Sequence, residues 1–289
     1  MMFINKEYQL LFILIVCVII AKTDDQKKCD PPPIKEFTLR GHTISGTWIS
    51  SHHFLTSASS VSKFDSTGYV YTDTNQPVNI HSCGIDELLE VPTVALVDII
   101  PRVSKAYIFC NRGIRQFIGG GCVPPMIMEV CEPLPASTCI IPIGPTNINT
   151  DDPVSYYFLD PGNYWMEAKM HTNGSEFYVA YHFAGMEAGV SLFRTMNDKK
   201  ELIGSLMCHE KGKYIDDELA FFIRTEFMEK ALCALKQRFA NESIGLGITC
   251  NTKTTIPVIP QKPMLDLNKK ENEHRLKSCG NTTMIGRIR

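Results

Sequence analysis

Short apolar runs bounded by turn residues are the feature that most constrains how this chain can fold. The runs are rich in β-branched and aromatic residues and recur at intervals of roughly ten residues. They include residues 69–71, 105–109, 126–130, 154–158, 177–183, 192–193 and 202–206. Residues 36–58 add two further expected strands, joined by a turn at Gly41-His42. Many short strands at this spacing predict an all-β barrel or sandwich.

One helix is expected near the end of the strand-rich region. Apolar residues recur every four positions from Ile223 to Leu235, with Met228 and Leu232 beside this series. This period is typical of an amphipathic helix with one buried face. We therefore predict a helix over about residues 224–239.

The first 23 residues have the pattern of a secretory signal. Lys6 precedes an apolar run over residues 10–21, and Ala21-Lys22-Thr23 supplies small residues at the −3 and −1 positions of a cleavage site. The alternative is a membrane anchor. A bilayer span needs roughly 20 apolar residues, and the run over residues 10–21 is shorter than that. We expect a secreted, extracellular protein with no stable membrane anchor after cleavage.

The cysteines outside the signal form an even set, which predicts disulfides in an oxidising compartment. These ten residues are Cys29, Cys83, Cys110, Cys122, Cys131, Cys139, Cys208, Cys233, Cys250 and Cys279. None of them shows C-x-x-C spacing, so we expect no zinc site. We also expect no other metal and no cofactor. N-glycosylation sequons at Asn173, Asn241 and Asn281 agree with export.

Composition argues against nucleic acid as a partner, and it distinguishes the basic C-terminal end from the rest of the chain. The formal net charge of −2 gives no global attraction for nucleic acid. From residue 253 onward the chain has eight Lys/Arg against three Asp/Glu, and Pro257, Pro260 and Pro263 break regular structure. We expect residues 251–289 to be a solvated flexible end rather than a heparin- or membrane-binding segment.

The segment from Gly46 to Ser60 carries the clearest motif. It reads G-T-W-I-S-S-H-H-F-L-T-S-A-S-S. It resembles the stretch of trypsin-like serine proteases that holds the catalytic histidine, usually written G-[ST]-L-I-S-x-x-[HW]-[IV]-L-T-A-A-H-C. The frame is kept, but Ser59 stands at the histidine position and Ser60 at the cysteine position. The match is closest to the divergent branch expanded in nematodes, through residues 51–57 and the M-x-x-E-[LV] pattern of residues 126–130.

The resemblance spans roughly residues 34–240 and implies an architecture. It implies two six-stranded antiparallel β-barrels and a C-terminal α-helix within residues 24–250, with a boundary near residues 140–150. It also implies one disulfide, because a Cys-led N-terminal arm in that family can bridge to a cysteine before a proline turn. Cys29 and the Cys139-Ile140-Ile141-Pro142 turn fit this pair.

The resemblance also locates the positions of the catalytic triad, and every one of them has changed. Triad chemistry needs a nucleophile, a histidine base and a carboxylate that orients the base. Ser59 replaces the histidine. The carboxylate falls at Pro124 or, in a shifted alignment, at Thr93. Glu187 replaces the nucleophilic serine.

The neighbouring positions of the substrate cleft follow from the same alignment. The nucleophile motif G-D-S-G-G-P aligns with G-M-E-A-G-V at residues 185–190, which keeps Gly185 and Gly189. Tyr181 falls at the base of the specificity pocket, where a bulky phenol would fill the space. The aspartate that pairs with a newly freed N-terminus in the family is replaced by Met186.

Other polar residues are interpreted as structural. His52 and His53 belong to the frame of the motif, and the spacing of His182 from Glu187 does not select an acid/base pair. The acidic runs Asp151-Asp152 and Asp216-Asp217-Glu218 are expected to be turn and surface charge rather than metal ligands.

These observations predict a catalytically silent protease homologue that acts by binding an extracellular protein partner. Two alternatives stay open at this point. One is an active serine endopeptidase whose triad lies elsewhere, although the chain contains no G-x-S-x-G or G-D-S-G motif. The other is a disulfide-rich adhesion or structural domain, which a sandwich rather than two barrels would favour.

Overall fold

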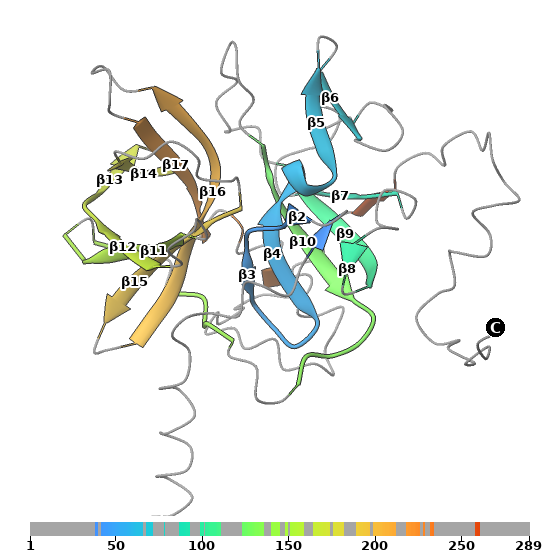
Figure 1. The fold of residues 1–289 in the computed structure, drawn as a ribbon, viewed down its shortest axis with the longest axis horizontal. Helices are drawn as coiled ribbons and strands as arrows, with labels where there is room; N and C mark the ends of the chain where they lie inside the picture. The colour runs from blue at the N-terminus through green and yellow to red at the C-terminus, as the bar shows by residue number, and fades with distance from the viewer. Residues whose placement is uncertain are drawn as a thin grey trace, which may run out of the picture.

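The computed structural model describes the strand-forming part of the chain and a few residues beyond it. The described residues are 38–39, 42–65, 68–71, 78, 87–92, 99–100, 102–110, 123–135, 140–144, 148–149, 151–158, 164–173, 176–181, 189–196, 199–211, 218–225, 228, 232–233 and 258–260. Most of them are β-strand, and two main sheets stand side by side (Figure 1). The predicted all-β, trypsin-like fold class is confirmed.

The first main sheet has six strands in the order β18-β7-β9-β10-β4-β3. The strands are β3 (Thr47–Trp48), β4 (His53–Ser57), β7 (Glu87–Glu90), β9 (Val103–Cys110), β10 (Pro125–Val130) and β18 (Val258–Pro260). Two small sheets accompany it: β2-β1-β8 and β5-β6. Their strands are β1 (Thr38–Leu39), β2 (His42–Thr43), β8 (Ile99–Ile100), β5 (Ser62–Asp65) and β6 (Gly68–Tyr71).

The second main sheet has seven strands in the order β12-β11-β15-β16-β17-β14-β13, and all its pairings are antiparallel. The strands are β11 (Val154–Phe158), β12 (Tyr164–Ala168), β13 (Met170–Asn173), β14 (Glu176–Tyr181), β15 (Ser191–Met196), β16 (Lys199–Lys211) and β17 (Glu218–Arg224). The resemblance implied six strands here, whereas the apolar runs located four of the seven, β11, β14, β15 and β16, and missed β12, β13 and β17.

The buried side chains form three clusters that explain why several strands are apolar on both faces. One cluster lies inside the first sheet and includes Phe54, Met126 and Met128. A second lies inside the other sheet. The third joins the two sheets and includes Leu55 and Ile127, which pair with each other across β4 and β10 and lie next in sequence to the first cluster's residues. Because β4 and β10 bury both faces, neither shows a strict alternation of apolar and polar residues, and β10 is mostly apolar along its length.

The third cluster also contains three described residues of the expected C-terminal helix, Met228, Leu232 and Cys233. Thr225, Met228, Leu232 and Cys233 have helical backbone, and all four are buried. Their spacing corresponds to one face of a helix. Arg224 still belongs to β17, so the predicted start at residue 224 was one residue early. The remaining residues of the predicted helix lie outside the described residues.

The expectation that this end lacks regular structure is wrong for residues 258–260. These residues form β18, which pairs with β7 in parallel register, Val258 opposite Leu88 and Pro260 opposite Glu90. Proline is tolerated there because an edge strand leaves one side of its backbone outside the ladder. Neither Pro260 nor the basic composition of this segment indicated a strand.

Candidate functional site

The residues predicted at the histidine position lie on a short 3-10 helix directly after β4. This helix, η3, comprises Ala58–Ser60. Ser57 caps it in an extended conformation, and its hydroxyl accepts a hydrogen bond from the Ser59 N–H at 3.2 Å. Val61 ends the turn by donating its N–H to the Ala58 carbonyl at 3.0 Å. The turn leaves Ser59 exposed, while Ala58 is buried beneath it.

Pro124, the first residue proposed for the carboxylate position, lies beside this turn. Its carbonyl accepts a hydrogen bond from the Ala58 N–H at 2.9 Å, and it is buried. The pairing of β10 with β4 holds the two segments together, with Pro125 opposite Ser57. The structure therefore brings Pro124 and Ser59 to the same end of the first sheet. Thr93, the other proposed residue, lies outside the described residues.

Gly189 connects the second sheet to this same place. Its φ of 101° lies in the left-handed region that side chains other than glycine rarely adopt. A Cβ on this residue would lie 2.5 Å from the Ser45 carbonyl oxygen and 3.0 Å from the Ser57 nitrogen. Its N–H donates to the Leu206 carbonyl of β16 at 2.9 Å. The segment that follows the nucleophile position thus lies against the capping residue of η3.

The other residues predicted for the cleft are less completely defined. Tyr181 is the last residue of β14, where it pairs with Glu218 of β17. Gly185, Met186, His182 and Glu187 lie outside the described residues, so their predicted positions in the cleft stay predictions.

Two buried polar contacts that the sequence did not indicate lie around Gly189, and one of them joins the two sheets. The Thr47 hydroxyl of β3 donates to the Ser191 hydroxyl of β15 at 2.7 Å, and both residues are buried. Thr56 Oγ1 donates to the Ser45 carbonyl at 2.5 Å. We call Ser45, Thr47, Thr56, Gly189 and Ser191 the junction cluster. No local pattern could have identified it, because it joins residues up to 144 positions apart.

Comparison with known proteins decides the family. The profile of the Nematode trypsin-6-like family matches residues 19–237. The chain belongs to this family. No curated protein matches it. The family assignment confirms the resemblance predicted from residues 46–60 and residues 126–130.

The histidines of this trypsin-6-like protein are held by the structure in different ways. His53 of β4 is 1% exposed, and its Nδ1 lies 2.7 Å from the Ser50 hydroxyl. Desolvation by burial, followed by the charge of the neighbouring His52, lowers the pKa of His53 to about 4. His53 is therefore neutral at physiological pH, which agrees with its interpretation as a packed residue. His52 is half-buried, and its Nδ1 lies 3.0 Å from the Ser51 hydroxyl.

Other predicted sites of this trypsin-6-like protein fall partly within the described residues. Cys131, after β10, and Cys233, in the helical segment, are each disulfide-bonded. The Cys29–Cys139 pair and the sequons at Asn241 and Asn281 lie outside the described residues and stay predictions. Asn173 ends β13 opposite Glu176, and its glycosylation also stays a prediction.

Metal-holding side-chain groups and membrane-spanning helices are both absent from the described residues. Within them, no group of three or more His, Cys, Asp or Glu side chains has an arrangement that could hold a metal ion. The same part of the chain contains no helix long and apolar enough to cross a membrane.

Proposed function

We propose that this trypsin-6-like protein is a secreted, catalytically silent protease homologue that acts by binding another extracellular protein. The observation that carries the proposal is the chemistry of η3 and its neighbour. A serine and a proline lie at the end of the first sheet, in the positions where the alignment expects an imidazole base and a carboxylate. Neither can perform the role that the position requires.

The physical reason is that acyl transfer needs a group that accepts the proton of the serine nucleophile. A serine hydroxyl attacks a carbonyl only when a neighbouring base accepts its proton, and that base must be basic near neutral pH. The Ser59 hydroxyl is no such base, and the Pro124 ring has no carboxylate to orient one. With Glu187 aligned at the nucleophile position, the chain lacks all three functions in these positions.

The retained framework supports a binding role. The Thr47–Ser191 hydrogen bond of the junction cluster joins the two sheets, and Gly189 keeps a conformation that only glycine adopts easily. A fold whose catalytic positions have changed while its framework persists is a rigid platform for loops that recognise other molecules. The even cysteine set and the sequons support an extracellular setting.

A fluorophosphonate probe tests the proposal, because it reacts with activated serine nucleophiles. The full chain is expressed through a secretory pathway, shown to be folded by circular dichroism, and treated beside trypsin as a positive control. We expect no labelling. Labelling that disappears in Ser59→Ala, or in an alanine variant of any other serine found by mass spectrometry, would refute the silent-enzyme proposal.

The binding half of the proposal has its own test. Crosslinking of the tagged, folded protein in extracellular fluid of its source should recover a saturable protein partner that competes with unlabelled protein. A partner recovered equally well by heat-unfolded protein would contradict a folded binding surface.

A further inference from the structure

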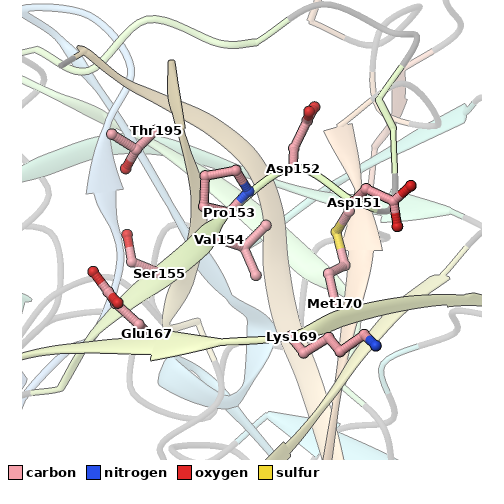
Figure 2. Close-up of a pocket in the computed structure, with 9 residues that line it drawn as sticks. All are labelled: Asp151, Asp152, Pro153, Val154, Ser155, Glu167, Lys169, Met170 and Thr195. Atoms are coloured by element: carbon pink, nitrogen blue, oxygen red, sulfur yellow. The ribbon is translucent and has the colours of Figure 1, made fainter. Parts of the chain in front are cut away.

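An open pocket of about 640 Å³ lies on the second sheet, and its lining includes the Asp151-Asp152 run noted in the sequence (Figure 2). It is bordered by the start of β11, the turn between β12 and β13, and β15. Its volume is within the range of pockets that hold small ligands or side chains. Its polar wall includes Asp151, Asp152 and Glu167, and its apolar wall includes Val154 and Met170.

Ser155 gives this pocket a feature that a surface of acidic side chains lacks. It is 5% exposed, and within the described part of the chain its buried hydroxyl has no hydrogen-bond partner. Ser155 lines the pocket, and the register of β11 against β12 puts it opposite Glu167, on the same face of the sheet (Figure 2). A buried hydroxyl without a partner costs free energy, so its presence calls for an explanation.

The charge around the pocket is negative after its internal ion pairs are counted. Arg194 donates to Asp152 at 2.9 Å and to Glu201 at 2.6 Å, so one lining carboxylate is already paired. Desolvation by burial disfavours the charge of Arg194, but hydrogen bonds and charge from Glu201 and Asp152 outweigh it and raise the Arg194 pKa, so the guanidinium stays protonated. Asp151 and Glu167 are exposed, and Lys169 is the one further cation that lines this pocket.

We propose that this pocket binds the guanidinium group of an arginine side chain on an extracellular protein partner. The inference rests on the proposed binding function and adds a defined site and ligand chemistry to it. A guanidinium has five N–H donors in a fixed planar arrangement, which can serve a hydroxyl and a carboxylate at the same time. Ser155 and Glu167 lie on one face and supply such a pair of acceptors. Val154 and Met170 offer an apolar wall for the aliphatic stem of the side chain.

The test uses a fluorescein-labelled Gly-Ser-Gly-Arg-Gly-Ser-Gly amide and the matching peptide with citrulline, which is uncharged but almost the same shape. Binding to the full folded chain is followed by fluorescence anisotropy at low ionic strength. We expect binding of the arginine peptide only. Glu167→Gln should weaken it about two- to fivefold, the range for an exposed charge pair. Glu132→Gln changes the same charge on the first sheet, where Glu132 is also exposed, and should have no effect.

Ser155→Ala gives a second, independent signature. Loss of an acceptor for a charged donor should weaken arginine binding about tenfold. Removal of an unpartnered buried hydroxyl should at the same time raise the melting temperature by about 2–4 °C. A residue that only supports the fold would not combine weaker binding with higher stability.

Three results would overturn the proposal: no binding of either peptide, equal binding of the citrulline peptide, or equal weakening by Glu167→Gln and Glu132→Gln. Protection of the protein against heat by Ca²⁺ alone, abolished in Glu167→Gln, would also overturn it in favour of a cation site. Failure of the pocket is distinguishable from failure of the proposed function, because fluorophosphonate labelling does not depend on this pocket.

Discussion

Replacement of Gly189 by alanine is the sharpest test of how the two sheets meet. Gly189 combines a φ of 101° with close neighbours: an added Cβ would lie 2.5 Å from the Ser45 backbone oxygen and 2.9 Å from the Thr56 side-chain Oγ1. Contacts below 3.0 Å require atoms to move, and backbone moves less easily than the end of a flexible side chain. The substitution therefore strains the junction cluster itself.

The size of the effect follows from two contributions. A left-handed conformation costs an L-residue roughly 1–2 kcal/mol relative to glycine. Overpacking against well-packed neighbours costs about 1–3 kcal/mol. Together they predict that Gly189→Ala lowers the free energy of unfolding by about 3 kcal/mol, which corresponds to a melting temperature about 6–12 °C lower for a domain of this size.

Gly144→Ala provides the matched control. Its added Cβ would lie 3.1 Å from the Ile203 Cγ2 methyl, a side-chain atom that can shift, and its φ lies outside the left-handed range. We expect it to cost less than about 1 kcal/mol. Both variants are measured by scanning calorimetry and guanidinium titration of the secreted protein. A Gly189→Ala shift below about 2 °C, or one equal to that of Gly144→Ala, would refute the described contact between Gly189 and the end of β4.

Three further predictions concern buried polar groups. A double-mutant cycle of Thr47→Val and Ser191→Ala, measured by denaturant titration, should give a coupling of about 1 kcal/mol, and additive effects would argue against the bond between the sheets. Arg194→Met should destabilise by about 2–3 kcal/mol because two partly buried carboxylates lose their cation; an unchanged melting temperature would contradict this. His53 has a folded pKa of about 4, below its unfolded value of 6.5, so its contribution is complete above pH 6.5 and is lost as pH falls toward 4. The His53→Asn variant should lack this loss of up to about 3 kcal/mol, and identical pH profiles for the two proteins would exclude the assignment.

Much of the strand pattern could be predicted because it depends on local composition. The runs at residues 126–130 and 154–158 are apolar and β-branched or aromatic, and they form β10 and β11 almost residue for residue. The strand Glu218–Arg224 was missed, because its apolar residues run directly into the helical series and the change of period falls within one segment. The strand Val258–Pro260 was missed because proline and a polar context usually argue against a strand.

The sequence by itself indicated the family and the all-β class, and it predicted which residues stand at the catalytic positions, because these depend on a motif with fixed local spacing. Only the tertiary structure decided which distant residues meet. It brought Gly189 against Ser57, Thr47 against Ser191, and Arg194 between Asp152 and Glu201. It also placed the Ser155 hydroxyl beside an acidic pocket. Sheet pairing and packing between separate sheets fix such contacts, and no local periodicity records them.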